Sequence, residues 1–157
     1  MYLTNDNEVL EKLAKRTVSY LEELLPLSIS GDFKIEKIDT IEYLDNSSFI
    51  TFSNGISSTV GMSVSNGLAS QITKAFIFGE PTKDEIIQLK QECIKEVLNI
   101  TVGNIISDLE LVKSGAIVNI STPFTTEKES TIKRKEKKRL QIKLQINNTS
   151  IILFYFK

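Results

Sequence analysis

The stretch TKDEIIQLKQECIKEVLNITVGNIISDL, residues 82–109, predicts a long helix from about Lys83 to Leu109. Thr82 followed three positions later by Glu85 is a capping-box pattern, which marks the start of a helix. At about 100° per residue, the apolar side chains fall in one broad arc that should face a sheet. This arc contains Ile86, Ile87, Leu89, Cys93, Ile94, Val97, Leu98, Ile105 and Leu109.

A set of four residues lies roughly opposite this apolar arc, on successive turns of the predicted helix. We call Glu92, Glu96, Asn99 and Gly103 the polar stripe. Glu and Asn on the exposed face of a helix are most often simply solvated. Gly103 stands out, because a glycine inside a helix costs about 1 kcal/mol relative to alanine. Either close approach of a partner backbone or simple tolerance by the fold explains it. Asn104 falls inside the apolar arc, so we expect its amide to make a buried hydrogen bond.

The rest of the chain predicts two more helices and about six strands. The helices are expected at about residues 6–24 and 66–78, with Ser65 as the cap of the second. The strands are expected at about residues 33–38, 47–53, 56–64, 116–120, 139–146 and 149–156. Asn54-Gly55 and Asn147-Asn148 are turn pairs that join strands as hairpins.

Strands that pair as hairpins, and do not alternate one by one with helices, argue against a parallel doubly wound sheet. The expected fold class is therefore α+β, a mainly antiparallel sheet with two to three helices packed on one face. With 157 residues and no linker of low complexity, we expect one domain over residues 1–157.

The composition restricts the chemistry. The chain has no histidine and one cysteine, Cys93, which excludes Ser–His and Cys–His dyads, histidine metal sites and an internal disulfide. Cys93 is expected to fill the core. No apolar run approaches the roughly 20 residues that span a bilayer, and the N-terminus lacks a signal-peptide pattern. We therefore expect a cytoplasmic protein without membrane insertion.

Residues 92–104, ECIKEVLNITVGN, followed by Pro123, resemble the signature of the CheC/CheX/FliY phosphatases of bacterial chemotaxis. That signature has an acidic or hydroxyl residue, Glu four positions later, Asn three later, then Gly and a more distant Pro. Glu92 stands where the family usually has Asp or Ser. The resemblance covers about residues 33–124. The helix expected at 66–78 has no Glu-x-x-Asn, and a single signature is typical of CheX rather than CheC.

The resemblance implies a phosphatase whose substrate is the phosphorylated aspartate of a CheY-type response regulator. It implies that the partner supplies the acyl phosphate and its Mg²⁺, so that this chain needs no cofactor and no metal site. Asn99 would orient the attacking water, and Glu96 would contact the partner's active-site lysine. Gly103 would let the partner surface come close, and Glu92 would add a contact at the rim.

Two further inferences complete the expectation from the family. Pro123 should shape the entry to a strand rather than touch substrate. We expect a homodimer with C2 symmetry, the commonest closed assembly. CheX relatives dimerise by continuing a sheet across the two-fold axis. The apolar stretch at residues 151–156 could serve that purpose or could be buried within one subunit.

Two alternatives stay open at this point. A CheX-like adaptor would bind a response regulator or a flagellar switch protein without hydrolysing anything, although the intact pair of Glu96 and Asn99 argues against it. Binding of nucleic acid is suggested by six basic residues among the seven at positions 133–139. No aromatic residue interleaves with them, and residues 1–110 carry 9 Lys/Arg against 17 Asp/Glu. We therefore expect no nucleic-acid partner, and a solvated turn or edge strand there.

Overall fold

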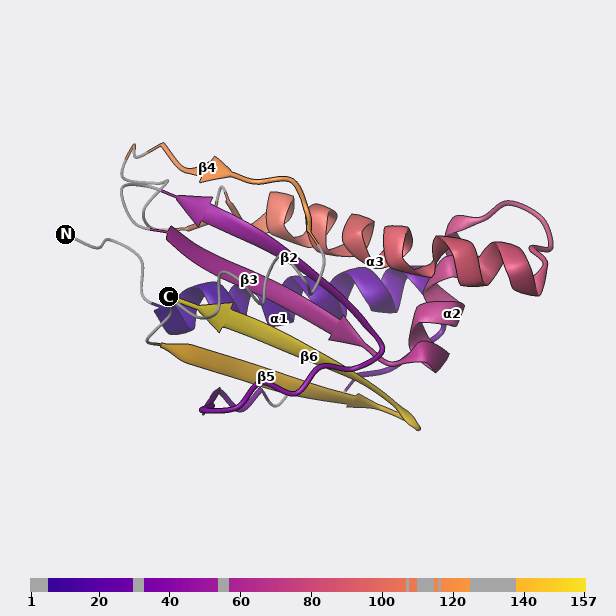
Figure 1. Ribbon diagram of the computed structural model, residues 1–157, viewed down its shortest axis with the longest axis horizontal. Helices are drawn as coiled ribbons and strands as arrows, with labels where there is room; N and C mark the ends of the chain where they lie inside the picture. Colours follow the sequence, from indigo (N-terminus) through magenta and orange to yellow (C-terminus); the bar gives the residue numbers. More distant parts are fainter. Residues whose placement is uncertain are drawn as a thin grey trace.

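The computed structural model describes residues 6–29, 33–53, 57–106, 108–109, 115, 117–124 and 138–157. Within these ranges, three helices cover one face of an antiparallel sheet, as Figure 1 shows. The helices are α1 (Asp6–Leu24), α2 (Asn66–Phe76) and α3 (Lys83–Ile106). The strands are β1 (Glu36–Lys37), β2 (Asn46–Ser53), β3 (Ser57–Val64), β4 (Asn119–Ile120), β5 (Arg139–Ile146) and β6 (Thr149–Phe156), in the order β1-β5-β6-β3-β2-β4. The predicted α+β class is confirmed.

Two long hairpins form the centre of the sheet. Strands β2 and β3 pair along their whole length, and so do β5 and β6. The pairing of β3 with β6 joins the hairpins side by side. Asn147 has a φ of 54°, the left-handed conformation that the predicted tight turn requires. The other predicted turn, Asn54-Gly55, lies outside the described residues.

Some predicted boundaries differ from the structure. The strand expected at 33–38 shrinks to β1, and the segment that follows packs Ile38, Ile41, Tyr43 and Leu44 against the face opposite the helices. Helix α2 ends at Phe76 and α3 at Ile106, each a few residues early. Ser65 precedes α2, but its side chain makes no capping hydrogen bond. Its hydroxyl accepts instead from the Ser150 N–H at 3.1 Å, which ties α2 to β6.

The main core lies between the helices and the sheet. Its largest fully buried side chains include Leu10, Leu13, Leu21, Ile50, Met62, Leu68, Ile72, Ile94 and Leu98. Strand β6 lies between β5 and β3, and its residues 151–156 are buried. Of the two roles expected for this apolar stretch, the structure shows burial within one subunit. The homodimer stays a prediction.

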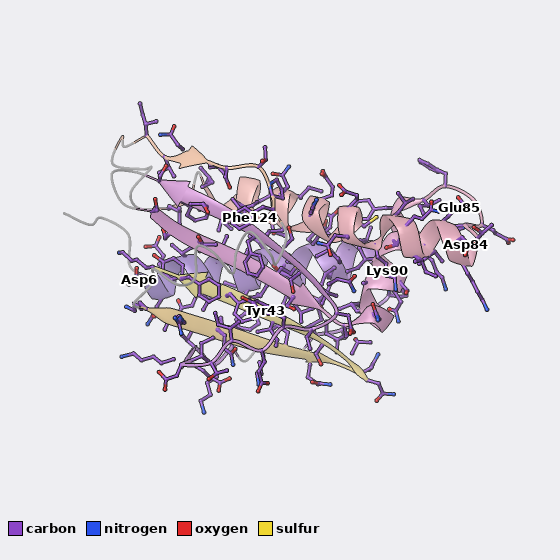
Figure 2. All side chains as sticks on the ribbon, viewed as in Figure 1. Asp6, Tyr43, Asp84, Glu85, Lys90 and Phe124 are labelled. Carbon is purple, nitrogen blue, oxygen red and sulfur yellow. The ribbon has the colours of Figure 1, made fainter. Side chains whose placement is uncertain are left out.

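A second, aromatic cluster covers the opposite face of the sheet, where Figure 2 shows Tyr43 and Phe124. Phe49 on β2 and Phe154 on β6 both pair with Gly61 of the strand between them, and their rings stack at 6.3 Å. A Cβ atom at Gly61 would overlap the Cδ1 and Cε1 atoms of Phe49. Glycine at this position therefore leaves the space that the Phe49 ring fills.

We predict that Gly61→Ala lowers the free energy of unfolding by about 1–3 kcal/mol, the usual cost of overpacking a core. Urea unfolding followed by circular dichroism measures it. The double variant Gly61→Ala/Phe49→Leu is the control, because a smaller side chain at position 49 relieves the overlap. The double variant should lose less free energy of unfolding than the two single variants lose in sum. Additive losses would show that the overlap is not the cause.

The Asp6 carboxylate joins the start of α1 to the last two strands. It accepts hydrogen bonds from Lys138 Nζ at 2.7 Å, Tyr155 Oη at 2.8 Å and Lys157 Nζ at 3.2 Å. Burial alone would raise the pKa of Asp6, but these three donors outweigh it and the pKa lies below its usual value. Burial also raises the pKa of Tyr155 well above the usual range, so this phenol donates throughout the physiological range.

We predict that Asp6→Asn lowers the free energy of unfolding by about 1–2 kcal/mol at pH 7. Because the folded-state pKa of Asp6 is depressed, its stabilisation is complete above the usual carboxyl pKa and is lost as pH falls through the folded-state value. The difference in the free energy of unfolding between wild type and Asp6→Asn should therefore disappear in acid. Thermal unfolding between pH 7 and pH 2.5 tests this, with Asp39→Asn at an exposed carboxyl as the control. A gap that does not change with pH would contradict it.

Candidate functional site

Burial of one face of α3 fixes which residues the helix presents to solvent. The helix packs against α1, α2 and β2. Its buried side chains are Ile86, Ile94, Val97, Leu98, Thr101, Val102 and Ile105. The predicted capping box is present, with Thr82 N to Glu85 Oε1 at 3.2 Å and Glu85 N to Thr82 Oγ1 at 3.1 Å. Gln91 Nε2 also donates to Ser47 O at 2.6 Å, which locks the helix to the start of β2.

Three residues of α3 differ from the sequence-based prediction. Ile87 and Leu89 are 65% and 39% exposed. The first turns of α3 extend past the end of the sheet, so no strand covers them (Figure 1). Asn104 is also exposed rather than buried. The buried arc is centred near Ile94 and Thr101, which places Asn104 at its edge, where solvent reaches the amide.

The four residues of the polar stripe are all exposed, as the periodicity of the helix predicts. Glu92 already has a partner within the helix, since Lys95 Nζ lies 3.1 Å from its Oε1. Among the described residues, neither Glu96 nor Asn99 has a hydrogen bond or an ion pair. One carboxylate and one amide, one turn apart, therefore stand open to a partner molecule.

Gly103 ends the polar stripe with open space in front of it. A Cβ atom at this position would meet nothing within 4 Å. In contrast to Gly61, no neighbour within the described part of the chain requires glycine here. Close approach of a partner at Gly103 stays a prediction.

Helix α1 flanks the polar stripe on one side. Arg16 Nη2 pairs with Asp108 Oδ2 at 2.8 Å, just beyond the C-terminal end of α3. Further along α1, burial raises the pKa of the half-buried Tyr20, and the nearby charge of Glu96 raises it further. Sequence reasoning assigned Tyr20 to no site. Only the packing of α1 on α3 brings it near Glu96, so no local pattern could have revealed it.

Cys93 lies beside the stripe but packs against the main core, as expected for a filler residue. It is half-buried rather than fully buried. Burial raises the pKa of its thiol, and the charges of Glu92 and Glu96 act in the same direction, against a hydrogen bond with Thr73. The side chain is therefore a neutral thiol at neutral pH, which makes it a poor nucleophile.

Two other features are absent from the described residues. Among them, no three Asp, Glu or Cys side chains gather as metal ligands would. Over the same residues, no helix has the length and apolar content that a membrane crossing needs.

Pro123 is half-buried and precedes Phe124, whose backbone pairs with Phe49 of β2. Pro123 thus precedes an isolated bridge rather than a named strand, and its role in strand entry stays a prediction.

The basic run lies mostly outside the described residues, which include only Lys138 and Arg139 of it. Both contact this chain itself. Lys138 pairs with Asp6, and Arg139 Nη1 donates to Asp39 O at 2.7 Å. These two cations thus hold α1 and the segment after β1 to the end of the sheet.

Together, the fold and the polar stripe define an α+β protein with a helix-borne Glu-x-x-Asn site. Residues 47–145, more than half of the chain, match the family model of the chemotaxis phosphatase CheX, and the chain belongs to this family. A comparison with curated protein sequences gave no match.

Solved structures of similar fold include CheX from Desulfovibrio desulfuricans and CheX from Vibrio vulnificus. The first is 16% identical with a TM-score of 0.65, over 96% of this chain and 99% of that one. The second is 15% identical with a TM-score of 0.69, over 95% and 98%. The CheX–CheY–BeF3–Mg²⁺ complex from Borrelia burgdorferi matches at 17% identity and a TM-score of 0.66, over 93% and 94%. These matches show that the fold is shared.

We predict that Gly103→Ala raises the free energy of unfolding by up to about 1 kcal/mol, because alanine favours the helix and its methyl group meets no neighbour. Chemical unfolding measures this change. Gly67→Ala, near the start of α2, is the comparison, because its Cβ would lie 3.3 Å from Thr149 Cγ2. We expect it to stabilise less. Destabilisation by Gly103→Ala would mean that the fold itself requires this glycine.

Proposed function

We propose that this protein hydrolyses the phospho-aspartate of a CheY-type response regulator, with Asn99 orienting the attacking water. The observation that carries the proposal is the open pair of Glu96 and Asn99 on a helix whose opposite face is fixed by burial. Membership of the CheX family supports the class of reaction. The similar fold from Borrelia burgdorferi, solved with CheY, BeF3 and Mg²⁺, supports the class of partner.

The reaction needs little covalent chemistry from this chain. Water attacks phosphorus as the bond to the aspartyl oxygen breaks, and the electron pair of that bond stays on the aspartate as a carboxylate. The protons of the water leave with the phosphate product. Phosphoryl transfer of this kind depends on positioning and on stabilisation of charge. We assign the Mg²⁺ that assists it to the regulator, so that this chain contributes side chains only.

An amide suits the positioning of water. The Asn99 side chain can accept a hydrogen bond from the water and donate another without changing its charge at neutral pH. It is exposed, and among the described residues it is not engaged elsewhere. This role matches that of the glutamine that orients water in Ras-type hydrolysis.

Glu96 is proposed to bind the regulator's active-site lysine. An exposed carboxylate without an internal partner breaks no existing interaction when it forms a charge-assisted hydrogen bond at an interface. Such a bond fixes the register of the two proteins as well as adding affinity. Gly103 then allows the surfaces to close, and Glu92 lies at the rim. We extend the proposal to a C2 homodimer that acts in the cytoplasm.

The test follows loss of label from a CheY-type regulator that carries ³²P-labelled phosphate. Wild-type protein is expected to accelerate the loss. Asn99→Ala should return the rate to that of the regulator alone, a drop of about 100-fold or more, because nothing then orients the water. Its affinity for the regulator should change little. Glu96→Ala should weaken binding as well, since the partner's lysine loses its carboxylate.

Asn104→Ala is the matched control, because it removes an exposed amide from the same helix outside the polar stripe. It should dephosphorylate the regulator at the wild-type rate. Wild-type protein that binds the phosphorylated regulator without accelerating loss of label would identify an adaptor. Absence of binding to any CheY-type regulator would overturn the proposal altogether.

A further inference from the structure

A cation borders the polar stripe, and the function proposed above does not use it. Lys95 follows Glu92 by three residues and precedes Asn99 by four. Its Nζ lies 3.1 Å from Glu92 Oε1. The Lys95 side chain is only 24% exposed, whereas that of Glu92 is 67% exposed. The lysine stem therefore packs against the protein while its ammonium reaches the surface beside the stripe.

The position of Lys95 places it next to the amide of Asn99. Side chains four residues apart on a helix are neighbours, and each leans toward the N-terminal turn. The Asn99 amide therefore covers the turn that carries Lys95 and Glu96. A group that docks along the stripe near Asn99 therefore meets the Glu96 carboxylate and, nearer the start of the helix, the Lys95 ammonium beside Glu92.

This arrangement meets a requirement of the proposed reaction. A phosphoryl group carries two negative charges, and in the transition state its charge is spread over three oxygens. Glu92 and Glu96 alone would repel it. The other lysines of α3 lie elsewhere, since Lys83 is in the first turn and Lys90 Nζ is directed to Asn66 Oδ1 at 3.3 Å. Lys95 is thus the cation of α3 that can offset this repulsion.

We propose that Lys95 binds the phosphoryl group of the regulator and that its ammonium is paired with Glu92 only until the regulator docks. On docking, Lys95 Nζ leaves Glu92 and donates to a phosphoryl oxygen. An exposed ion pair between residues three apart is weak, so a doubly charged phosphoryl group displaces the carboxylate readily. This inference rests on the proposed function and adds a phosphate-binding residue to it.

Steady-state dephosphorylation at varied regulator concentration tests the inference. Lys95→Gln is expected to lower kcat at least about tenfold with a smaller change in KM, because the ammonium acts most strongly on the charge of the transition state. Lys95→Arg should restore most of the loss. Lys83→Gln, which removes a cation from the same helix outside the site, should match wild type. A change in KM alone, or no change, would overturn the inference.

The variant Glu92→Gln keeps the Lys95 ammonium but removes its ion pair. It frees Lys95 from its partner in the helix, so kcat is expected to rise by up to about twofold, the strength of such a pair. A tenfold loss of kcat in this variant as well would show that the pair acts as a structural brace, and the inference would be wrong.

A binding measurement distinguishes failure of this inference from failure of the proposed function. Affinity for the regulator is measured by calorimetry with and without beryllium fluoride and Mg²⁺. Lys95→Gln should reduce the preference for the beryllium fluoride form at least about threefold, and Lys83→Gln should leave it unchanged. If wild type binds the phosphorylated regulator but does not hydrolyse it, the proposed hydrolysis is wrong. The preference for the beryllium fluoride form then tests the role of Lys95 by itself. An unchanged preference in Lys95→Gln would refute that role.

Discussion

The packing of α3 is the constraint on which the site depends. Its buried side chains contact the sheet on one side and the two other helices on the others. Each large apolar side chain removed from water contributes about 1.5–3 kcal/mol, whereas burying a carboxylate without a partner costs several kcal/mol. Turning the helix by one residue would expose Ile94 and Leu98 and push Glu96 toward the core. The helix therefore has one stable rotation, and this rotation exposes the polar stripe.

The sheet on which α3 packs is itself stabilised by contacts on its far face and at one end. On the far face, Phe49 fills the space left by Gly61 and stacks with Phe154, so the two central hairpins are joined by rings as well as by backbone hydrogen bonds. At one end, Asp6 ties α1 to the C-terminal strand through Tyr155 and Lys157. The positioning of a water molecule that we propose for Asn99 would need such rigid support, because small displacements of a positioning group cost much of its effect.

Much of the fold could be predicted from local sequence. The hairpin strands follow from turn residues such as Asn147-Asn148, and the start of α3 follows from the capping box at Thr82 and Glu85, both of which act over a few residues. The predictions fail at residues whose surroundings are set by segments distant in the sequence. Ile87 is exposed because the sheet ends before the helix does, and Ser65 fails as a cap because β6 engages its hydroxyl. Neither neighbour can be read from the helix sequence.

The candidate site was predictable for the same local reason, since the order of the polar stripe is set by the helix period. What sequence could not show is which of its charges are free. Glu92 departs from the Asp or Ser typical of the family, and its longer side chain is the one that reaches Lys95 at 3.1 Å. The carboxylate at the first position and the lysine three residues on are best understood together. In this chain the pair holds the Lys95 ammonium at the edge of the polar stripe, beside Glu92.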